Sequence, residues 1–359
     1  MTSGILDEPD ALRRLDRSDM LAAVAALPTG LSEGWASTRG VTLPAAHRAA
    51  SSVAVLGMGG SAIAGDIVAG VFADRLSRPL GVVRDYELPA FAGPQTLVIA
   101  SSFSGATEET IASLAVALER RCPVVVVTTG GPMLDVARRA ELPHLAFDGG
   151  GQPRAALGRS MGILAGLLER AGMLALDDDE VAGAAAAGQE MVGACQPGLA
   201  LDRNVAKQLA WDVVDRLPTV EAAGWLGAIA RRWKTQLNEN GKSAAWWEEL
   251  PEATHNTVVG YAEPETLSDR LVVIFLAGAE DHPRSRRRAE LSGELLKAAG
   301  IDHRVVTLAG HGRLAQAMSG IVLGDYMSVY LGVLYGHDPT PVEAIGLLKA
   351  RLAAGDGSD

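Results

Sequence analysis

Short apolar runs alternate with longer helix-type segments along most of the chain. The run Val53–Gly57 is apolar at nearly every position, which is typical of a strand that is buried on both faces of a parallel sheet. Similar runs predict four further strands near Gly81–Tyr86, Leu97–Ser101, Val124–Thr128 and Leu145–Phe147. Helix-type segments separate these runs, and the alternation predicts an α/β fold with a doubly wound parallel sheet.

A second and weaker series of strands follows the first. Its strands are predicted near Thr219–Ala223, Thr257–Tyr261, Leu271–Leu276 and His303–Thr307. Long helices are predicted around Ala228–Trp246 and Pro283–Ala299. The apolar run Leu314–Tyr335 is interrupted by polar residues, which favours a packed helix over a membrane span. Because the strand–helix rhythm occurs twice, we expect a duplicated layout without close sequence repetition.

The same pattern divides the chain into four parts. The first part is predicted to be helical around Asp10–Ala26 and to end in a connector that contains Gly and Ser. A helix over Leu157–Leu176 closes the first α/β domain. The predicted parts are an N-terminal helical segment, the first α/β domain, the second α/β domain, and a C-terminal helix and tail, at residues 1–45, 46–178, 200–335 and 336–359.

The segment Ser51–Asp66 joins a buried strand to a glycine turn and the start of a helix. Gly57, Gly59 and Gly60 allow a sharp turn and a close approach of the backbone to a ligand. Ser61 is predicted to be the N-cap of the helix. Free backbone N–H groups and the positive end of the helix dipole favour an anion at this place. A tight turn without any ligand is the alternative explanation.

Two nucleotide-binding motifs match this turn only in part. A Walker A loop needs a lysine after its last glycine, and here Ser61 follows Gly60. The dinucleotide motif G-x-G-x-x-G fits from Gly57 to Ala62 if alanine is allowed at the last position, with Asp85 as the acidic residue further on. A nicotinamide-dependent oxidoreductase is therefore still an alternative at this point.

A hydroxyl-rich loop follows the predicted strand near Leu97–Ser101. Ser102, Ser104 and Thr107 place three hydroxyl groups on one turn at the start of a helix. Hydroxyl and backbone N–H groups can hold a phosphate there without a metal ion. A serine-rich helix cap is the alternative explanation, but two such loops in one α/β domain favour a phosphate site at the carboxyl ends of parallel strands.

Composition restricts the class of function. The 359 residues carry a formal net charge of −11, which disfavours nucleic acid as the main partner. Cys122 and Cys195 are too few for a disulfide framework or a cysteine metal site, and the seven histidines are scattered. The basic run Arg284–Arg288 is predicted to be a solvated helix face. No uninterrupted apolar segment reaches the ~18 residues that a membrane span requires, so neither a metal nor a membrane is expected.

One carboxylate in the second domain has an unusual context. Glu239 stands between Asn238 and Asn240 near the end of a helix-type segment, and asparagine is unfavourable in a helix unless a polar contact requires it. We therefore take Glu239 as a candidate general base. His255 follows in a turn. A solvated surface carboxylate and a structural histidine are the alternative explanations.

These motifs, taken together, resemble the bifunctional phosphoglucose/phosphomannose isomerases of the sugar-isomerase-domain superfamily. The resemblance covers about residues 45–350, with the motifs in the expected order. The E-N-x-K and P-E-x-x-H-N elements are its most specific parts. The matching segments are Gly57–Ser61, Ser102–Thr110, Pro153–Leu157, Arg232–Lys234, Asn238–Lys242, Pro251–Asn256, Gly324–Tyr330, Asp338–Ile345 and Leu348–Lys349.

The resemblance implies two flavodoxin-like sugar-isomerase domains, a homodimer with shared active sites, and a cytoplasmic enzyme without metal or cofactor. Its substrate would be a hexose 6-phosphate. Arg154 would stabilise an enediolate, Glu239 would move the proton between C1 and C2, and His255 of the partner subunit and Lys349 would assist ring opening. The residues expected to hold the phosphate are Gly60, Ser61, Ser102, Ser104 and Thr107.

The sequence also departs from the family pattern. Ala106 replaces an asparagine that the family often has in the serine loop, and Gly241 replaces a serine after the Glu239-Asn240 pair. Neither change removes a proposed catalytic group, but the preference between glucose and mannose substrates stays open. A sugar-phosphate sensor on the same fold is the other hypothesis, and it would need the phosphate loops but no base.

Overall fold

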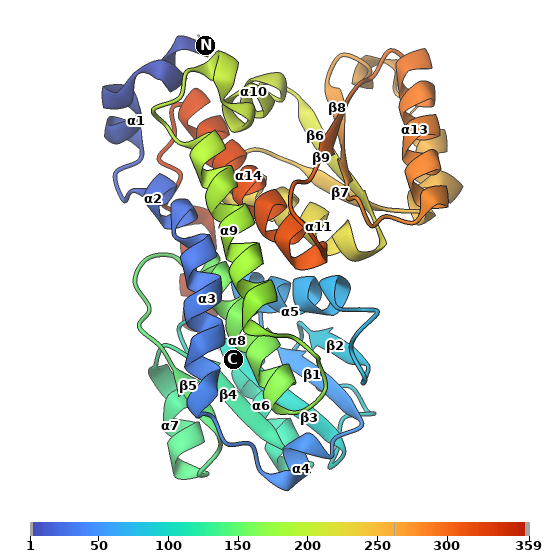
Figure 1. The fold of residues 1–359 in the computed structure, drawn as a ribbon. Helices are drawn as coiled ribbons and strands as arrows, with labels where there is room; N and C mark the ends of the chain where they lie inside the picture. Colours follow the sequence, from blue (N-terminus) through green and yellow to red (C-terminus); the bar gives the residue numbers. More distant parts are fainter. Residues whose placement is uncertain (1–2, 262, 356–359) are drawn as a thin grey trace.

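The computed structural model describes residues 3–261 and 263–355, and it contains two parallel sheets (Figure 1). The first sheet has the strand order β2-β1-β3-β4-β5, and every pair is parallel. All five strands predicted for this part are present. Their bounds are Ser52–Leu56 (β1), Leu80–Val83 (β2), Thr96–Ser102 (β3), Val124–Thr128 (β4) and His144–Ala146 (β5).

The second sheet has the order β7-β6-β8-β9 and is also parallel throughout. Its strands are Leu217–Ala223 (β6), Trp246–Leu250 (β7), Leu271–Ala277 (β8) and Asp302–Thr307 (β9). In each sheet the first strand in the sequence has its two successors on opposite sides. The duplicated layout expected from the strand–helix rhythm is therefore present.

One predicted strand of the second sheet is wrong. Thr257–Tyr261 is not a strand, because Asn256 caps a short helix there: its Oδ1 accepts from the Thr257 N–H at 2.6 Å. The strand lies earlier, at β7, where the predicted helix Ala228–Trp246 was expected to end and a turn to follow. Since β7 is an edge strand, it tolerates the charged Glu248 and Glu249, which obscured the strand pattern.

The helices cover both faces of the sheets and join them. The helix bounds are Pro9–Leu15 (α1), Met20–Ala25 (α2), Leu27–Ser37 (α3), Ala45–Arg48 (α4), Gly59–Val71 (α5), Glu108–Glu119 (α6), Gly131–Arg139 (α7), Leu157–Arg170 (α8), Asp178–Cys195 (α9), Val205–Asp212 (α10), Gly227–Glu239 (α11), Thr257–Gly260 (α12), Pro283–Ala298 (α13), Arg313–Leu334 (α14) and Glu343–Gly355 (α15). Short 3-10 turns occur at Ser3–Asp7 (η1), Thr38–Gly40 (η2), Pro153–Ala156 (η3), Leu201–Arg203 (η4), Gly224–Leu226 (η5), Glu252–His255 (η6) and Glu265–Leu267 (η7).

The connector expected after Ala26 is in fact the helix α3, which packs along α8 (Figure 1). Its glycines permit this close packing instead of breaking the helix. A Cβ atom on Gly34 would lie 2.2 Å from the Arg159 carbonyl oxygen, and one on Gly162 would lie 2.2 Å from the Leu31 carbonyl oxygen. The two backbones therefore approach each other more closely than any other residue type would allow.

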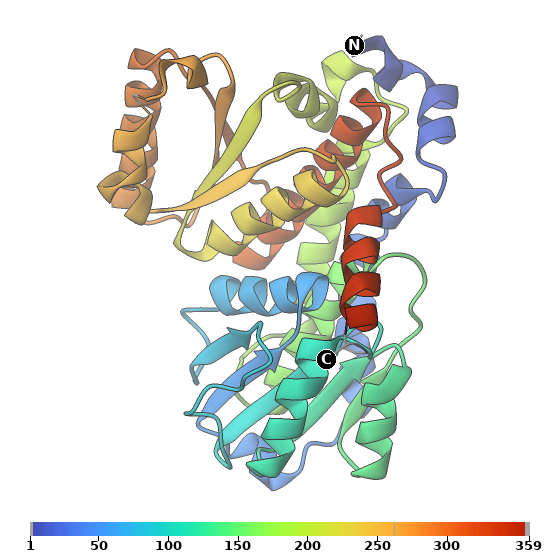
Figure 2. The same ribbon diagram turned by 180° about the vertical axis from the view of Figure 1, so that it is seen from behind.

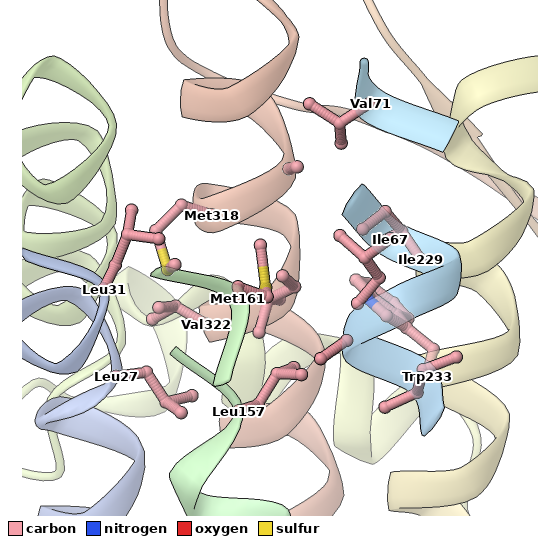
Figure 3. Close-up of a cluster of buried hydrophobic side chains, with 14 of the residues drawn as sticks. Leu27, Leu31, Ile67, Val71, Leu157, Met161, Ile229, Trp233, Met318 and Val322 are labelled. Carbon is pink, nitrogen blue, oxygen red and sulfur yellow. The ribbon is translucent and has the colours of Figure 1, made fainter. Parts of the chain in front are cut away.

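The long helix α14 forms part of a core that both domains share. Figure 3 shows side chains of α3, α5, α8, α11 and α14 meeting in one cluster, which includes Leu31, Ile67, Met161 and Trp233. Among the described residues, α14 is the one helix that is long and apolar enough to cross a membrane, but its whole apolar window is buried within the protein. It is therefore a packed core helix, as expected for the run Leu314–Tyr335.

Candidate active site

The side chain of Arg154 is buried where the two domains meet. It belongs to η3, just before α8, and only 3% of the residue is exposed. Its Nη2 donates to the carbonyl oxygens of Pro339 at 2.9 Å and Thr340 at 2.8 Å, and its Nε donates to Asn240 Oδ1 at 2.7 Å. These contacts fix the plane of the guanidinium group, and burial lowers its pKa while Glu239 opposes that shift.

Glu239 is the last residue of α11, and its carboxylate faces Arg154. The distance from Arg154 Nη1 to Glu239 Oε2 is 3.5 Å, and 29% of the Glu239 side chain is exposed. A carboxylate at the C-terminal end of a helix is unfavourable to the helix dipole, so this position depends on nearby cations. The fold thus brings together two of the predicted site residues from different domains.

A second cation stabilises the same helix end. Lys242 donates through Nζ to the carbonyl oxygens of Glu239, Pro339 at 3.0 Å and Pro341 at 2.6 Å. Partial burial lowers the pKa of Lys242, and the charge of Arg154 lowers it further. Lys242 therefore ties the end of α11 to the segment that leads into α15.

A buried polar network lies behind Arg154. Arg232 donates to both oxygens of Asp325, at 3.1 Å and 2.6 Å, and to the Arg154 carbonyl oxygen at 2.8 Å. Asn240 donates to Ser328 Oγ at 3.0 Å, and Ser328 donates to the Asp325 carbonyl oxygen at 2.6 Å. These groups hold both the backbone and the side chain of Arg154 in place.

The glycine turn after β1 packs directly against η3. A Cβ atom on Gly60 would lie 2.9 Å from the Pro153 carbonyl oxygen, so only glycine fits at this contact. The prediction that Ser61 is the N-cap is wrong: α5 begins at Gly59, its N-cap is Met58, and Ser61 is buried in the first turn. The glycines themselves form the first residues of the helix here, so the helix begins earlier than the serine suggested.

The serine loop after β3 is ordered by its own hydroxyl groups. Ser102 Oγ lies 2.7 Å from Thr107 Oγ1 and accepts from the Gly105 N–H at 3.1 Å. Ser104 Oγ accepts from the Ala106 N–H at 3.2 Å, and Ser104 is exposed. Because β1 and β3 are neighbouring parallel strands, this loop and the glycine turn lie at the same edge of the sheet, where open α/β sheets bind ligands.

A cavity of about 550 Å³ opens beside Glu239. Its walls come from the end of α11, the segment before α15 and the first turn of α15. The residues that line it include Glu239, Lys242, His337, Asp338 and Glu343. The candidate base is thus accessible from this cavity, whereas Arg154 stays buried behind it.

Two predicted residues are not joined to this cluster within one chain. Among the described residues, neither His255 nor Lys349 has a hydrogen bond or ion pair to Arg154 or Glu239, and both are exposed. His255 lies in η6 beyond the end of β7, whereas Glu239 precedes the start of that strand. Figure 2 shows the chain leaving α11 and running back along β7. The five residues of β7 span roughly 16 Å at the usual rise of a strand.

The supporting residues Arg232, Asn240 and Asp325 were not predicted to have a role. Arg232 and Asp325 are both 1% exposed, and they form a buried ion pair. A sequence signal was available, since Asp325 is a carboxylate within an apolar helix and a fully buried carboxylate requires a partner. The identity of that partner, which lies 93 residues away, could not be inferred from the pattern.

Comparisons with known proteins agree with this architecture. The family model described as the bacterial phospho-glucose isomerase C-terminal SIS domain matches residues 202–352. A bifunctional phosphoglucose/phosphomannose isomerase from Caldicellulosiruptor bescii is 33% identical over 335 residues, which cover 93% of this chain and 99% of that protein. One from Aquifex aeolicus is 31% identical, covering 82% and 88%.

A solved structure supports the fold independently. A hypothetical protein from Thermus thermophilus superimposes with a TM-score of 0.76 and 19% identity, over 97% of this chain and 94% of that one. The match to the Caldicellulosiruptor relative spans nearly the whole chain, and both sheets therefore fall within it. The chain therefore belongs to the family of bifunctional phosphoglucose/phosphomannose isomerases.

Proposed function

We propose that this protein interconverts glucose 6-phosphate, and also mannose 6-phosphate, with fructose 6-phosphate as a metal-independent aldose–ketose isomerase. The observation that supports this most directly is the approach of Arg154 Nη1 to Glu239 Oε2 at 3.5 Å across the domain boundary. A base next to a fixed cation is what proton transfer beside a carbonyl group requires. The curated relatives are named for both activities.

In the proposed reaction, Glu239 removes the proton from C2 of the open-chain aldose. The electron pair forms the C1–C2 double bond of an enediolate, and the carbonyl oxygen O1 becomes an oxyanion that Arg154 stabilises. A proton passes from O2 to O1, and Glu239 returns its proton to C1, so that O2 becomes the ketose carbonyl. Because four contacts hold Arg154 in place, its charge is preorganised for the oxyanion.

We assign phosphate binding to the two loops at the edge of the first sheet. Gly60 and Ser61 contribute the first turn of α5, whose N–H groups and dipole favour an anion. Ser102, Ser104 and Thr107 contribute hydroxyl groups that can rotate toward a phosphate. The Ala106 position supplies no side-chain amide, so we expect the backbone and the hydroxyls to provide most of the contacts.

We further propose that the active site is completed by a second copy of the chain. Glu239 and His255 lie beyond opposite ends of β7, so one subunit does not bring them together. In a homodimer, His255 of the partner subunit would reach the sugar ring and assist its opening with Lys349. The proposed substrates are sugar phosphates, which are water-soluble metabolites. We therefore place the enzyme in the cytoplasm.

The central test replaces Glu239 by glutamine. Fructose 6-phosphate is supplied and the aldose products are followed by NMR. The E239Q protein should lose roughly 10²–10⁴-fold in turnover, the range of general-base catalysis, with its stability nearly unchanged. Glu119→Gln is the matched control, since Glu119 is an exposed last residue of α6. Near-normal turnover of E239Q would refute the assignment of the base.

The sensor hypothesis and the metal-free mechanism have separate tests. A sensor would bind fructose 6-phosphate without forming any aldose, even at high protein concentration. A metal-dependent enzyme would lose activity in a chelator and recover it with a divalent ion. We expect turnover in the wild-type protein and no effect of the chelator.

Subunit mixing tests the shared site. Inactive Glu239→Gln and His255→Ala proteins are combined, and mass spectrometry verifies that heterodimers form. If the two residues act in different subunits, one site of each heterodimer has neither defect, so activity reappears. Heterodimers without activity would rule out the shared site.

A further inference from the structure

The second domain has a crevice at the place that corresponds to the phosphate site of the first domain. Its volume is about 730 Å³. It lies at the carboxyl ends of β6 and β8. Between these two strands the order in which successive strands are added to the second sheet reverses. The loops after β6 and β8, the end of α5 and the starts of α13 and α14 line it. Such switch points are the usual ligand positions of doubly wound sheets.

The two crevices are related by the duplication of the fold. In the catalytic crevice, Arg154 precedes α8 and faces Glu239 at the end of α11. In the second crevice, Arg313 begins α14, and its Nη1 lies 3.0 Å from Oδ1 of Asp74, just past the end of α5. Each crevice thus pairs an arginine of one domain with a carboxylate at the end of a helix from the other domain.

The second crevice differs in the loop that should hold a phosphate. Glu280 and Asp281 occupy the loop after β8, where the first domain has Ser102 and Ser104 after β3. Arg313 is already paired with two carboxylates, since its Nε lies 3.5 Å from Glu280 Oε2. Arg286 also acts on Asp281, but the three carboxylates of Asp74, Glu280 and Asp281 still outnumber the two guanidinium groups, so the crevice favours a cation over a phosphate dianion.

Three buried polar atoms of this crevice have no hydrogen-bond partner among the described residues. They are Asp281 Oδ1, Trp225 Nε1 and Arg313 Nε, and Asp281 and Trp225 are each only 7% exposed. Burial raises the pKa of Asp281, and the Gly278 N–H, which donates to Asp281 Oδ2 at 2.8 Å, opposes that shift most, followed by the charge of Arg286 and the nearby Trp225 indole. Asp281 Oδ1 and Trp225 Nε1 do not meet in hydrogen-bond geometry. One acceptor and two donors left unpaired in one cavity favour a ligand that has both kinds of group.

We propose that this crevice is a second, non-catalytic binding site for a small cation that carries hydroxyl groups and no phosphate, such as an amino sugar. The amine would be held by the carboxylates of Glu280 and Asp281. A ligand hydroxyl would accept from the Trp225 indole N–H. The site does not depend on the proposed isomerase activity, because none of its residues belongs to the catalytic crevice.

The probe for this site is glucosamine, added to the full-length protein and followed by ligand-observed NMR. Saturable binding is expected, and neutral glucose should bind more weakly. Glu280→Gln and Asp281→Asn should each weaken glucosamine binding about tenfold, the effect of losing a hydrogen bond to a charged group. Glu280 is partly exposed, so E280Q should fold normally and keep wild-type isomerase activity without glucosamine.

Glu239→Gln serves as the control for the catalytic crevice, and it should leave glucosamine binding unchanged. The proposal is overturned if glucosamine does not bind saturably or if E280Q binds it as tightly as the wild type. It is also overturned if E239Q abolishes the binding, which would place glucosamine in the catalytic crevice. Equal affinity for glucose and glucosamine would overturn the assignment to a cation. Isomerase turnover is measured in a separate assay. A negative result for glucosamine binding would therefore not count against the proposed isomerase activity.

Discussion

The buried ion pair between Arg232 and Asp325 offers the sharpest test of how the site is held in place. Asp325 accepts from Arg232 at 3.1 Å and 2.6 Å, and both side chains are 1% exposed. Burial raises the pKa of Asp325, and the Arg232 guanidinium opposes that shift. Replacing Asp325 by asparagine keeps the shape of the side chain but removes its charge.

The expected loss follows from the charge that is left behind. The Arg232 guanidinium stays buried without a counter-ion, and breaking such a pair costs about 3–5 kcal/mol of unfolding free energy. Arg232 also donates to the Arg154 carbonyl oxygen at 2.8 Å. The D325N protein should therefore lose kcat as well, because Arg154 would no longer be fixed in the position that we propose for stabilising the oxyanion.

Urea unfolding followed by tryptophan fluorescence measures this loss, at one fixed protein concentration because association would add to stability. Glu290→Gln is the control: it breaks the Arg287–Glu290 pair, in which both side chains are 54% exposed, and should change the unfolding midpoint very little. A loss below about 1 kcal/mol in D325N, the size typical of a surface pair, would refute the view that this pair is desolvated and essential.

Two further predictions concern packing and thiol chemistry. Gly162→Ala should cost about 1–3 kcal/mol of unfolding free energy, because its Cβ would lie 2.2 Å from the Leu31 carbonyl oxygen, whereas Gly183→Ala, with open space around its Cβ, should not destabilise. Burial raises the pKa of the Cys195 thiol to about 12 and also raises that of Cys122. Neither cysteine should react with a thiol reagent at pH 8 until the protein is unfolded, and fast reaction of the native protein would contradict their burial.

The first sheet could be predicted from the sequence because its strands are buried on both faces. Strands β1, β3 and β4 are continuous apolar runs, and in each of them every residue but at most the first is buried. The edge strand β7 has half-exposed and charged residues, so its pattern resembles the end of a helix. Strands that are buried on both faces could therefore be predicted from their continuous apolar runs, whereas the edge strand β7 could not.

Glycine and serine residues gave ambiguous predictions of where helices begin and end. In α3, Gly30 and Gly34 suggested a connector, but they allow the helix to lie against α8. At the start of α5, Ser61 suggested a cap, but Gly59 already begins the helix. Both residue types are common in loops and in close helix contacts, and only the neighbouring backbone, which is distant in the sequence, distinguishes the two uses.

The pairing of Arg154 with Glu239 depends on how the two domains are arranged. Helices α5 and α11 each follow the first strand of their sheet, and they pack with their ends reversed. Gly70 near the end of α5 lies against Trp225 just before α11, and Gly60 at the start of α5 lies against η3, whose Arg154 faces Glu239 at the end of α11. This antiparallel arrangement places the end of each helix beside the ligand edge of the other domain. Two crevices result from a single duplication.

Divergence of the loops then determines what each crevice can do. In the proposed mechanism, hydroxyl groups and glycines at the first edge anchor the phosphate, which fixes the sugar so that one carboxylate suffices as the base. At the second edge, the carboxylates of Glu280 and Asp281 stand in place of those hydroxyl groups, so a phosphate has no anchor there. A base without an anchored substrate gives little catalysis, and this is why we assign the chemistry to the Glu239 crevice and only binding to its counterpart.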